Sequence, residues 1–272
     1  MKQPIKWTSI LALGASLAAV GGAQAASFKV RYGASIMGLP VGQLDVSSAI
    51  HGSSYEIQAT GKLVGLVGLF ASGKGGAVAN GSLRSIIGQK NTLNPVANSI
   101  FQASVRLGKS QKVVRIDTRN GNVTTLSMEP PMDDKPGRVQ LLTQHKRAVL
   151  DPLSATLMPM RGNELSEKDC NRTIPVFDGG SRLDIVMSYA GMRQADIGGY
   201  KGQVLVCNVR YVPLAGHRPA RRIIRYMMHN KDMSVWLAPI QGTGYMLPLR
   251  VSVRTAAGMA TLQAEQWNVT SE

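Results

Sequence analysis

Apolar and polar residues alternate along much of the chain in short segments. Such alternation places every second side chain on the same face of an extended strand. It recurs over residues 28–32, 55–60, 182–189, 205–211 and 249–254. Alternation with one polar side is typical of antiparallel sheets that have one face in water. The pattern therefore predicts a mainly β protein built from antiparallel strands.

The last part of the chain predicts a β-hairpin. Leu249, Val251 and Val253 share one face of a strand that ends before the small residues 256–258. Alternation resumes over 260–264, so a second strand is expected to return beside the first. The fold is expected to be a single β-rich domain over residues 26–272, with only a few short helices.

Two segments combine helical spacing with helix-start signals or an apolar stripe. Asp151 followed by Pro152 supplies the residue types preferred at the N-cap and the first helical position, so a helix is expected to open there and run to Leu157. Over 220–228 an amphipathic helix is expected, with its apolar side against the sheet. Its apolar stripe consists of Ala220, Ile223, Ile224, Met227 and Met228, and its basic stripe of Arg218, Arg221, Arg222 and Arg225. A third, brief helix is expected over 65–70.

The first 25 residues have the pattern of a secretory signal peptide. Lys2 and Lys6 precede an apolar run over 10–20, and the small-residue site Ala23-Gln24-Ala25 follows. Cleavage is expected between Ala25 and Ala26, because the apolar run is too short for an uncleaved anchor across a bilayer of ~30 Å. The pattern predicts an exported, periplasmic protein without an integral membrane span.

The chain has two cysteines, Cys170 and Cys207. An oxidising compartment allows them to form a disulfide, and no other thiol competes for either one. A redox or nucleophilic thiol usually shows a Cys-x-x-Cys or Cys/His frame, and neither frame is present. The sequence therefore predicts an intrachain disulfide.

Basic residues outnumber acidic ones, with 31 Lys and Arg against 16 Asp and Glu and a formal charge of +15. Without Lys2 and Lys6 the charge is 29 − 16, or +13. The chain lacks Arg-rich helices with interleaved aromatics, so nucleic acid is not the expected partner. Anionic lipid or another anionic envelope component fits better. Arg218, Arg221, Arg222 and Arg225 are the candidate anion-binding stripe, and a solvated basic surface is the simpler interpretation.

Motifs for nucleotide or metal binding are sparse. Residues 68–74 match the start of a phosphate-binding loop, but Gly75 stands where Ser or Thr holds magnesium. The histidines show no metal-ligand spacing to one another or to an acidic residue, so neither a metal site nor a cofactor is expected. These histidines are His51, His145, His217 and His229.

No nucleophile motif of the Gly-x-Ser-x-Gly type occurs, so no catalytic residue is assigned. A pair of carboxylates for glycan hydrolysis is defined by their distance in space, so it cannot be recognised from spacing along the sequence. Asp178 and Asp184 flank one expected strand pair, and ion pairs with Arg172 or Arg182 are their simpler interpretation.

Several motifs together resemble an exported Gram-negative family, domain of unknown function 3108. They are residues 38–42, 151–154 (Asp-Pro-Leu-Ser), 176–179 (Val-Phe-Asp-Gly), 207–211, 235–237 and 248–250. The resemblance implies a periplasmic, disulfide-containing protein with a curved antiparallel sheet, an open barrel or β-spiral similar to lipoprotein carriers. It implies no catalytic residue.

The expected function is non-enzymatic: binding of lipid or another anionic envelope component, or maintenance of the envelope. The alternatives are a hydrolase acting on cell-wall glycan or lipid, and a structural protein that binds a partner through a sheet edge. The sequence does not indicate the ligand or the oligomeric state.

Overall fold

The computed structural model describes residues 25–65, 73–84, 95–133 and 136–271. All of the expected signal peptide except its last residue, and most of the segment 65–74, therefore lie outside the described residues. The strands of the first half are β1 Ala25–Ile36, β2 Leu39–His51, β3 Ser54–Leu63, β4 Gly73–Leu83, β5 Val96–Leu107, β6 Ser110–Arg119 and β7 Asn122–Glu129. Those of the second half are β8 Met158–Pro159, β9 Arg172–Phe177, β10 Arg182–Ile197, β11 Tyr200–Ala215, β12 Met233–Ile240, β13 Tyr245–Thr255 and β14 Gly258–Ser271.

Helices are short and few among the described residues. Three 3-10 helices are η1 Thr143–Lys146, η2 Ser154–Thr156 and η3 Glu167–Asp169, and one α-helix is α2 Arg222–His229. None of them is long and apolar enough to cross a membrane. The expected amphipathic helix is confirmed, although it begins at Arg222 rather than at Ala220. The helix expected after Asp151 is a single 3-10 turn.

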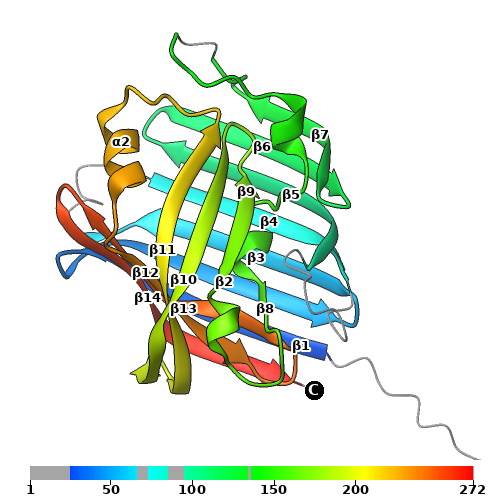
Figure 1. The fold of residues 1–272 in the computed structure, drawn as a ribbon, viewed down its shortest axis with the longest axis vertical. Coiled ribbons are helices and arrows are strands. Elements are labelled where there is room, and N and C mark those ends of the chain that lie inside the picture. The colour runs from blue at the N-terminus through cyan, green and yellow to red at the C-terminus, as the bar shows by residue number, and fades with distance from the viewer. Residues whose placement is uncertain (1–24, 66–72, 85–94, 134–135, 272) are drawn as a thin grey trace, which may run out of the picture.

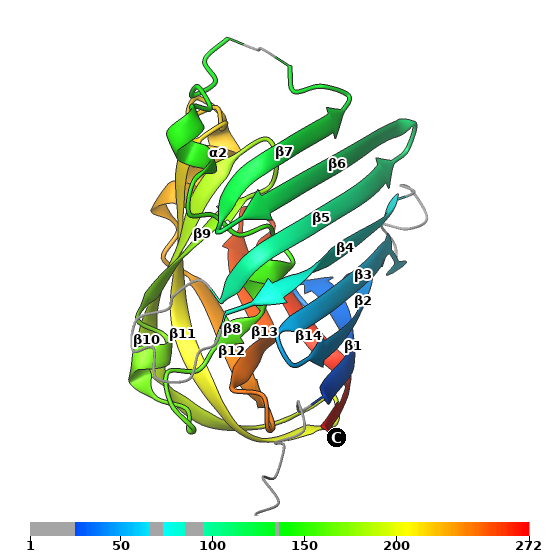
Figure 2. The same ribbon diagram turned by 90° about the vertical axis from the view of Figure 1, so that its right-hand side faces the viewer.

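All the strands belong to one antiparallel sheet, which confirms the predicted fold class. Its main path runs β7-β6-β5-β4-β3-β2-β1-β14-β13-β12-β11-β10-β9, and β8 pairs with β13 off this path. The sheet does not close on itself, because β7 and β9 end the path. It curls so that β1–β7 form one wall and β9–β12 the opposite wall, as Figures 1 and 2 show. The expected hairpin of β13 and β14 is confirmed, with Thr255 opposite Gly258.

The core fills the space between the two walls. One wall contributes Phe28, Ile57 and Ile116, all nearly or fully buried, and the other contributes Phe177, Leu205 and Leu237. Leu249 of β13 is fully buried as well. Between them lies the segment 149–158, whose residues Val149, Leu150 and Leu157 are buried. A well-packed interior of this kind provides most of the stability of a domain of this size.

The segment 149–150 also bridges the open seam of the sheet. The Val149 amide donates to the Gly121 carbonyl at the turn between β6 and β7 (2.8 Å). The Leu150 amide donates to the Pro175 carbonyl (2.8 Å) and its carbonyl accepts from the Phe177 amide of β9 (2.9 Å). These bonds satisfy part of the free edge of β9, which would otherwise attract another strand.

Candidate anion-binding surface

The helix α2 lies beside the end of β11, where β12 no longer accompanies it. The β11–β12 pairing covers only residues 205–208 of β11, and α2 occupies the space next to the rest of the strand (Figure 1). An Arg210 guanidinium nitrogen donates to the Met228 carbonyl at the end of the helix (3.2 Å). Buried Asn230 then fixes the following turn, since its side-chain amide donates to the Arg254 carbonyl of β13 (2.8 Å).

The apolar stripe of α2 contacts the protein only in part, which corrects the expectation. Ile224 and Met227 are half-buried, whereas Ile223 is 54% and Met228 37% exposed. At 3.6 residues per turn, Ile223 and Met228 lie roughly 70° to either side of the line through the buried pair. A helix of two turns that packs against a single strand edge buries only a narrow strip of its surface, so the side chains on either side of that strip, Ile223 and Met228, stay exposed.

A shallow depression of about 600 Å³ lies along one side of α2 and the turn that follows it. Its cations are Arg222, Arg225, Lys231 and Arg254, and its one acid is Asp232. Tyr226, His229 and Asn230 complete the lining. The Asp232 carboxylate lies 3.5 Å from the Arg254 guanidinium, and both side chains are at least half exposed, so water weakens this ion pair. The depression therefore carries an excess of positive charge.

Two of the four candidate arginines line this depression and two do not. Arg222 and Arg225 are one helical turn apart on the exposed side of α2. Arg218 and Arg221 precede the helix, where the Arg221 amide donates to the Arg218 carbonyl (3.0 Å). The sequence analysis missed Lys231 and Arg254. Arg254 comes to the site because β13 pairs with β12, and no local pattern reveals that pairing.

The other candidate residues have structural partners. Cys170 and Cys207 form the predicted disulfide, with Cα atoms 5.4 Å apart. Asp184 pairs with Arg182 (2.6 Å), as the simpler interpretation expected. Asp178 instead accepts hydrogen bonds from the Gly180 and Ser181 amides (2.9 and 2.6 Å), which fix the turn before β10.

Arg172 pairs with Asp169 rather than with either of these acids (3.4 Å), and both side chains are buried. Burial lowers the pKa of Arg172 to about 10, although the Asp169 charge opposes that shift. Within the described ranges, no three His, Cys, Asp or Glu side chains lie close enough together to hold a metal ion. Lys74 lies in β4, an extended strand, where a phosphate-binding loop would lead into a helix.

A buried polar cluster holds the segment between the walls, and sequence reasoning found only its cap. Asp151 accepts hydrogen bonds from the Leu153 and Ser154 amides (3.1 and 2.9 Å) and from the Ser154 hydroxyl (2.6 Å). The Ser154 hydroxyl also bonds to the Tyr55 hydroxyl of β3 (2.6 Å). Burial raises the pKa of Asp151 above its usual range, and these hydrogen bonds oppose the shift. Burial, followed by the nearby Asp151 charge, raises the pKa of Tyr55.

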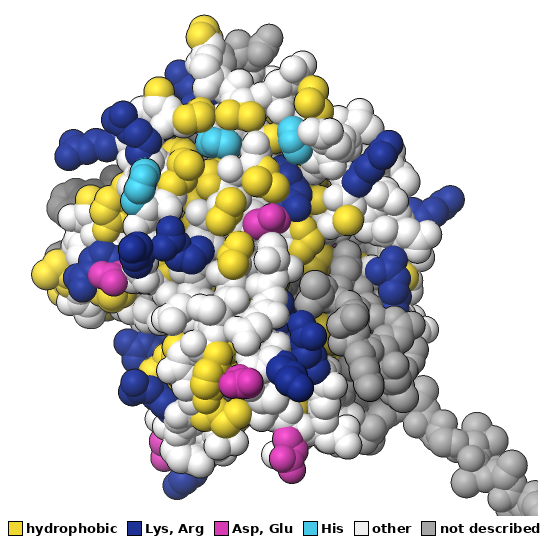
Figure 3. Space-filling model, in the orientation of Figure 1, with side chains coloured by type: hydrophobic (Ala, Val, Ile, Leu, Met, Phe, Trp, Pro, Cys, Tyr) yellow, Lys and Arg dark blue, Asp and Glu magenta, His cyan; other side chains and the backbone are white. Residues whose placement is uncertain are grey.

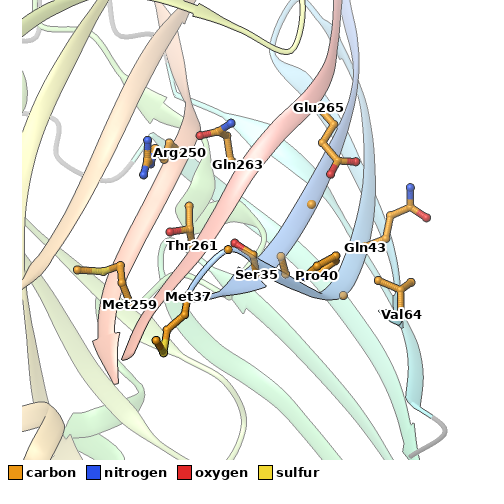
Figure 4. A pocket seen from close by; sticks show the side chains of 14 residues that line it. Ser35, Met37, Pro40, Gln43, Val64, Arg250, Met259, Thr261, Gln263 and Glu265 are labelled. Atoms are coloured by element: carbon orange, nitrogen blue, oxygen red, sulfur yellow. The ribbon is translucent and has the colours of Figure 1, made fainter. Parts of the chain in front are cut away.

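A second depression, of about 690 Å³, lies over β1, β2, β13 and β14 (Figure 4). Its polar lining includes Gln43, Gln263 and Glu265. Glu265 lies directly over Gly33, where an added Cβ would come within 2.0 Å of a carboxylate oxygen. This groove is mixed in chemistry and, unlike the depression beside α2, has no excess of one charge.

A model of one protein family matches residues 27–265, nearly the whole described chain. Its description is "Protein of unknown function (DUF3108)". The chain belongs to this family. No curated protein and no solved structure matched the chain.

Proposed function

We propose that this DUF3108 protein is a non-enzymatic binding protein of the cell envelope, which holds a phosphate-bearing anionic component beside α2. The observation that carries the proposal is the depression in which Arg222, Arg225, Lys231 and Arg254 face a single, weakly paired acid. Four cations around one concave surface repel one another, and an anionic ligand relieves that repulsion.

The chemistry of the lining favours phosphate over a simple carboxylate. Guanidinium groups match phosphate oxygens with two parallel hydrogen bonds, while Lys231 adds a compact charge. Tyr226 and Asn230 supply neutral polar groups at the same surface. The N-terminal signal pattern and the single disulfide support a periplasmic location, where anionic lipids and phosphorylated envelope polymers are available.

The two alternatives have less support. Hydrolysis of glycan or lipid needs free acids that face each other in a cleft, and Asp178 and Asp184 are already engaged in a turn and an ion pair. Partner binding through a sheet edge would use β7, because hydrogen bonds to Leu150 occupy part of the β9 edge.

The test is titration of the protein with a monomeric short-chain phosphatidylglycerol, followed by NMR shifts of backbone amides. We expect shifts at residues around the depression, and the R222Q/R225Q variant should lose about 10-fold or more in affinity, since charged hydrogen bonds contribute roughly 1.5–3 kcal/mol each. K29Q/K201Q, with the same change in charge outside the depression, is the matched control.

Inorganic phosphate provides a second arm of the same titration. If it binds as tightly as the lipid, the site recognises free phosphate rather than a lipid headgroup. The proposal fails if neither probe shifts these amides, or if the control variant loses as much affinity as R222Q/R225Q.

A further inference from the structure

Alternate strand connections of the first wall meet at one edge of the sheet. The turn at residues 37–38 joins β1 to β2, β3 ends and β4 begins there, and the turn at 108–109 joins β5 to β6. The β13–β14 turn adjoins them, because Ile36 pairs with both Leu39 and Ala260. We call this edge the turn rim. In Figure 1 it lies on the left, on the same side as α2.

The most exposed large apolar side chains of the described chain lie at the turn rim. They are Met37 (72%), Leu39 (61%) and Leu107 (59%). Leu107 extends over Gly73 together with Leu63, so the apolar side chains of β3 and β5 share one face of the rim. Isolated exposed apolar residues are common, but the three largest exposures at one edge indicate a contact surface.

Met37 is moreover an unfavourable choice for its turn. Met37 and Gly38 are the two central residues of a two-residue hairpin turn, and both have positive φ (52° and 81°). Such turns favour Asn-Gly or Asp-Gly, because a side chain without a short polar group is strained at positive φ. Met37 lies over Gly258 of the neighbouring turn, yet most of its side chain stays exposed at a strained position, which points to an additional role in contact.

The other face of the rim carries a row of cations. Lys62, Lys74 and Arg106 occupy directly opposite positions on β3, β4 and β5, and all three are exposed. Lys109 follows in the turn between β5 and β6, and Lys112 of β6 lies on the opposite face, across from Val105. Like charges directly opposite on neighbouring strands destabilise a sheet.

These five cations have no acidic partner in the part of the chain that the structure describes. None of them takes part in its ion pairs, and Arg106 donates only to the Gln111 side chain (2.7 Å). The neighbouring strand β7 carries one acid near this edge, Glu129, which lies opposite Val113 of β6. The residues that connect β3 to β4, 66–72, contain no Asp or Glu in sequence.

We infer that the turn rim docks on the surface of an anionic lipid bilayer. Unpaired cations beside exposed aliphatic side chains complement a surface with phosphates outside and hydrocarbon beneath. Lys62, Lys74 and Arg106 contact the phosphates, and Met37, Leu39 and Leu107 enter the headgroup region. Figure 3 shows Lys and Arg side chains along this same side of the molecule. Docking brings the α2 depression close to the headgroups, but it uses different residues.

The experiment is co-sedimentation of the protein with vesicles rich in phosphatidylglycerol, at low and raised salt. Each cation near such a surface contributes about fivefold, the equivalent of about 1 kcal/mol, so K62Q/K74Q/R106Q should bind on the order of 100-fold more weakly at low salt. The difference should shrink as salt rises. K29Q/K168Q/K201Q has the same change in charge away from the rim and should bind nearly as the parent does.

The M37N variant distinguishes a role of Met37 in membrane docking from a structural role in its turn. Asparagine suits the turn better than methionine, so this variant should be at least as thermostable as the parent. Its vesicle binding should nevertheless fall severalfold at both salt concentrations, because an apolar contact is not screened. L107S, with thermal unfolding measured alongside, should weaken binding in the same way.

Three outcomes would overturn the inference. The first is equal binding by M37N, L107S and the parent. The second is an equal loss of binding in the rim and control triple variants. The third is binding of the rim to an acidic polypeptide without any binding to vesicles. The titration with monomeric lipid is independent of the rim. Loss of the headgroup shifts with vesicle docking intact refutes the proposed function alone, and the reverse result refutes the docking alone.

Discussion

Replacing Cys170 and Cys207 together by alanine removes the covalent link between the segment before β9 and the central part of β11. The bridge spans 37 positions in sequence, and both cysteines are fully buried. In the chain-entropy model, closing a loop of this length lowers the entropy of the unfolded state and so raises its free energy by about 4 kcal/mol. The free energy of unfolding of the variant should therefore be lower by the same amount, ~4 kcal/mol.

The assay is thermal and urea unfolding of the parent, the reduced parent and the double alanine variant. For a domain of this size, a loss of about 4 kcal/mol lowers Tm by roughly 8–16 °C. The reduced parent controls for the small cavity that removal of two sulfur atoms leaves. Labelling of two free thiols in the untreated protein, or a fall in Tm of only about 2 °C, would refute the reasoning.

Three further predictions follow from buried groups and one close approach. Asp169→Ala should destabilise the protein by about 3–5 kcal/mol in urea unfolding, because it leaves Arg172 buried without its acidic partner; a loss below about 1 kcal/mol would contradict this. The raised pKa of Asp151 means that its contribution to stability is present below the unfolded pKa of 3.8 and is lost as pH rises through the folded pKa, so Asp151→Asn should flatten the rise in urea sensitivity as the pH increases above 3.8. Gly81→Ala should lower the free energy of unfolding by about 1–3 kcal/mol, since the new Cβ would lie 1.9 Å from the Asn98 carbonyl oxygen. An unchanged Tm would contradict this, because it would mean that β4 and β5 can move apart at no cost in stability.

Local patterns were enough to predict six of the strands, β1, β3, β10, β11, β13 and β14, and the last hairpin. Alternation over 249–254 and 260–264 corresponds to β13 and β14, and their register places Val251 opposite Leu262. The cap at Asp151 was also readable, because its chemistry involves residues two and three positions further on. These features depend on neighbours in sequence, which is why one sequence reveals them.

Features that depend on register between distant strands were out of reach. Nothing local indicates that Lys62, Lys74 and Arg106 lie side by side, since their alignment follows from two separate strand pairings. The same holds for the position of Arg254 beside α2. It also holds for the contact between Tyr55 and Ser154, which are 99 residues apart in sequence. The exposure of Ile223 was missed for another reason, because periodicity gives the side of a helix but not the width of its contact.

The order of strands has a consequence for how the protein folds. Along the main path, every pair of adjacent strands is consecutive in sequence except β1 and β14, which come from opposite ends of the described chain. The first seven strands can therefore pair one after another as they leave the ribosome or a translocation channel. One long edge of β1, however, stays unpaired until the final strand, β14, is available. An open edge of this length is a site for association with other chains. A chain truncated before β14 would consequently present β1 as a template for aggregation.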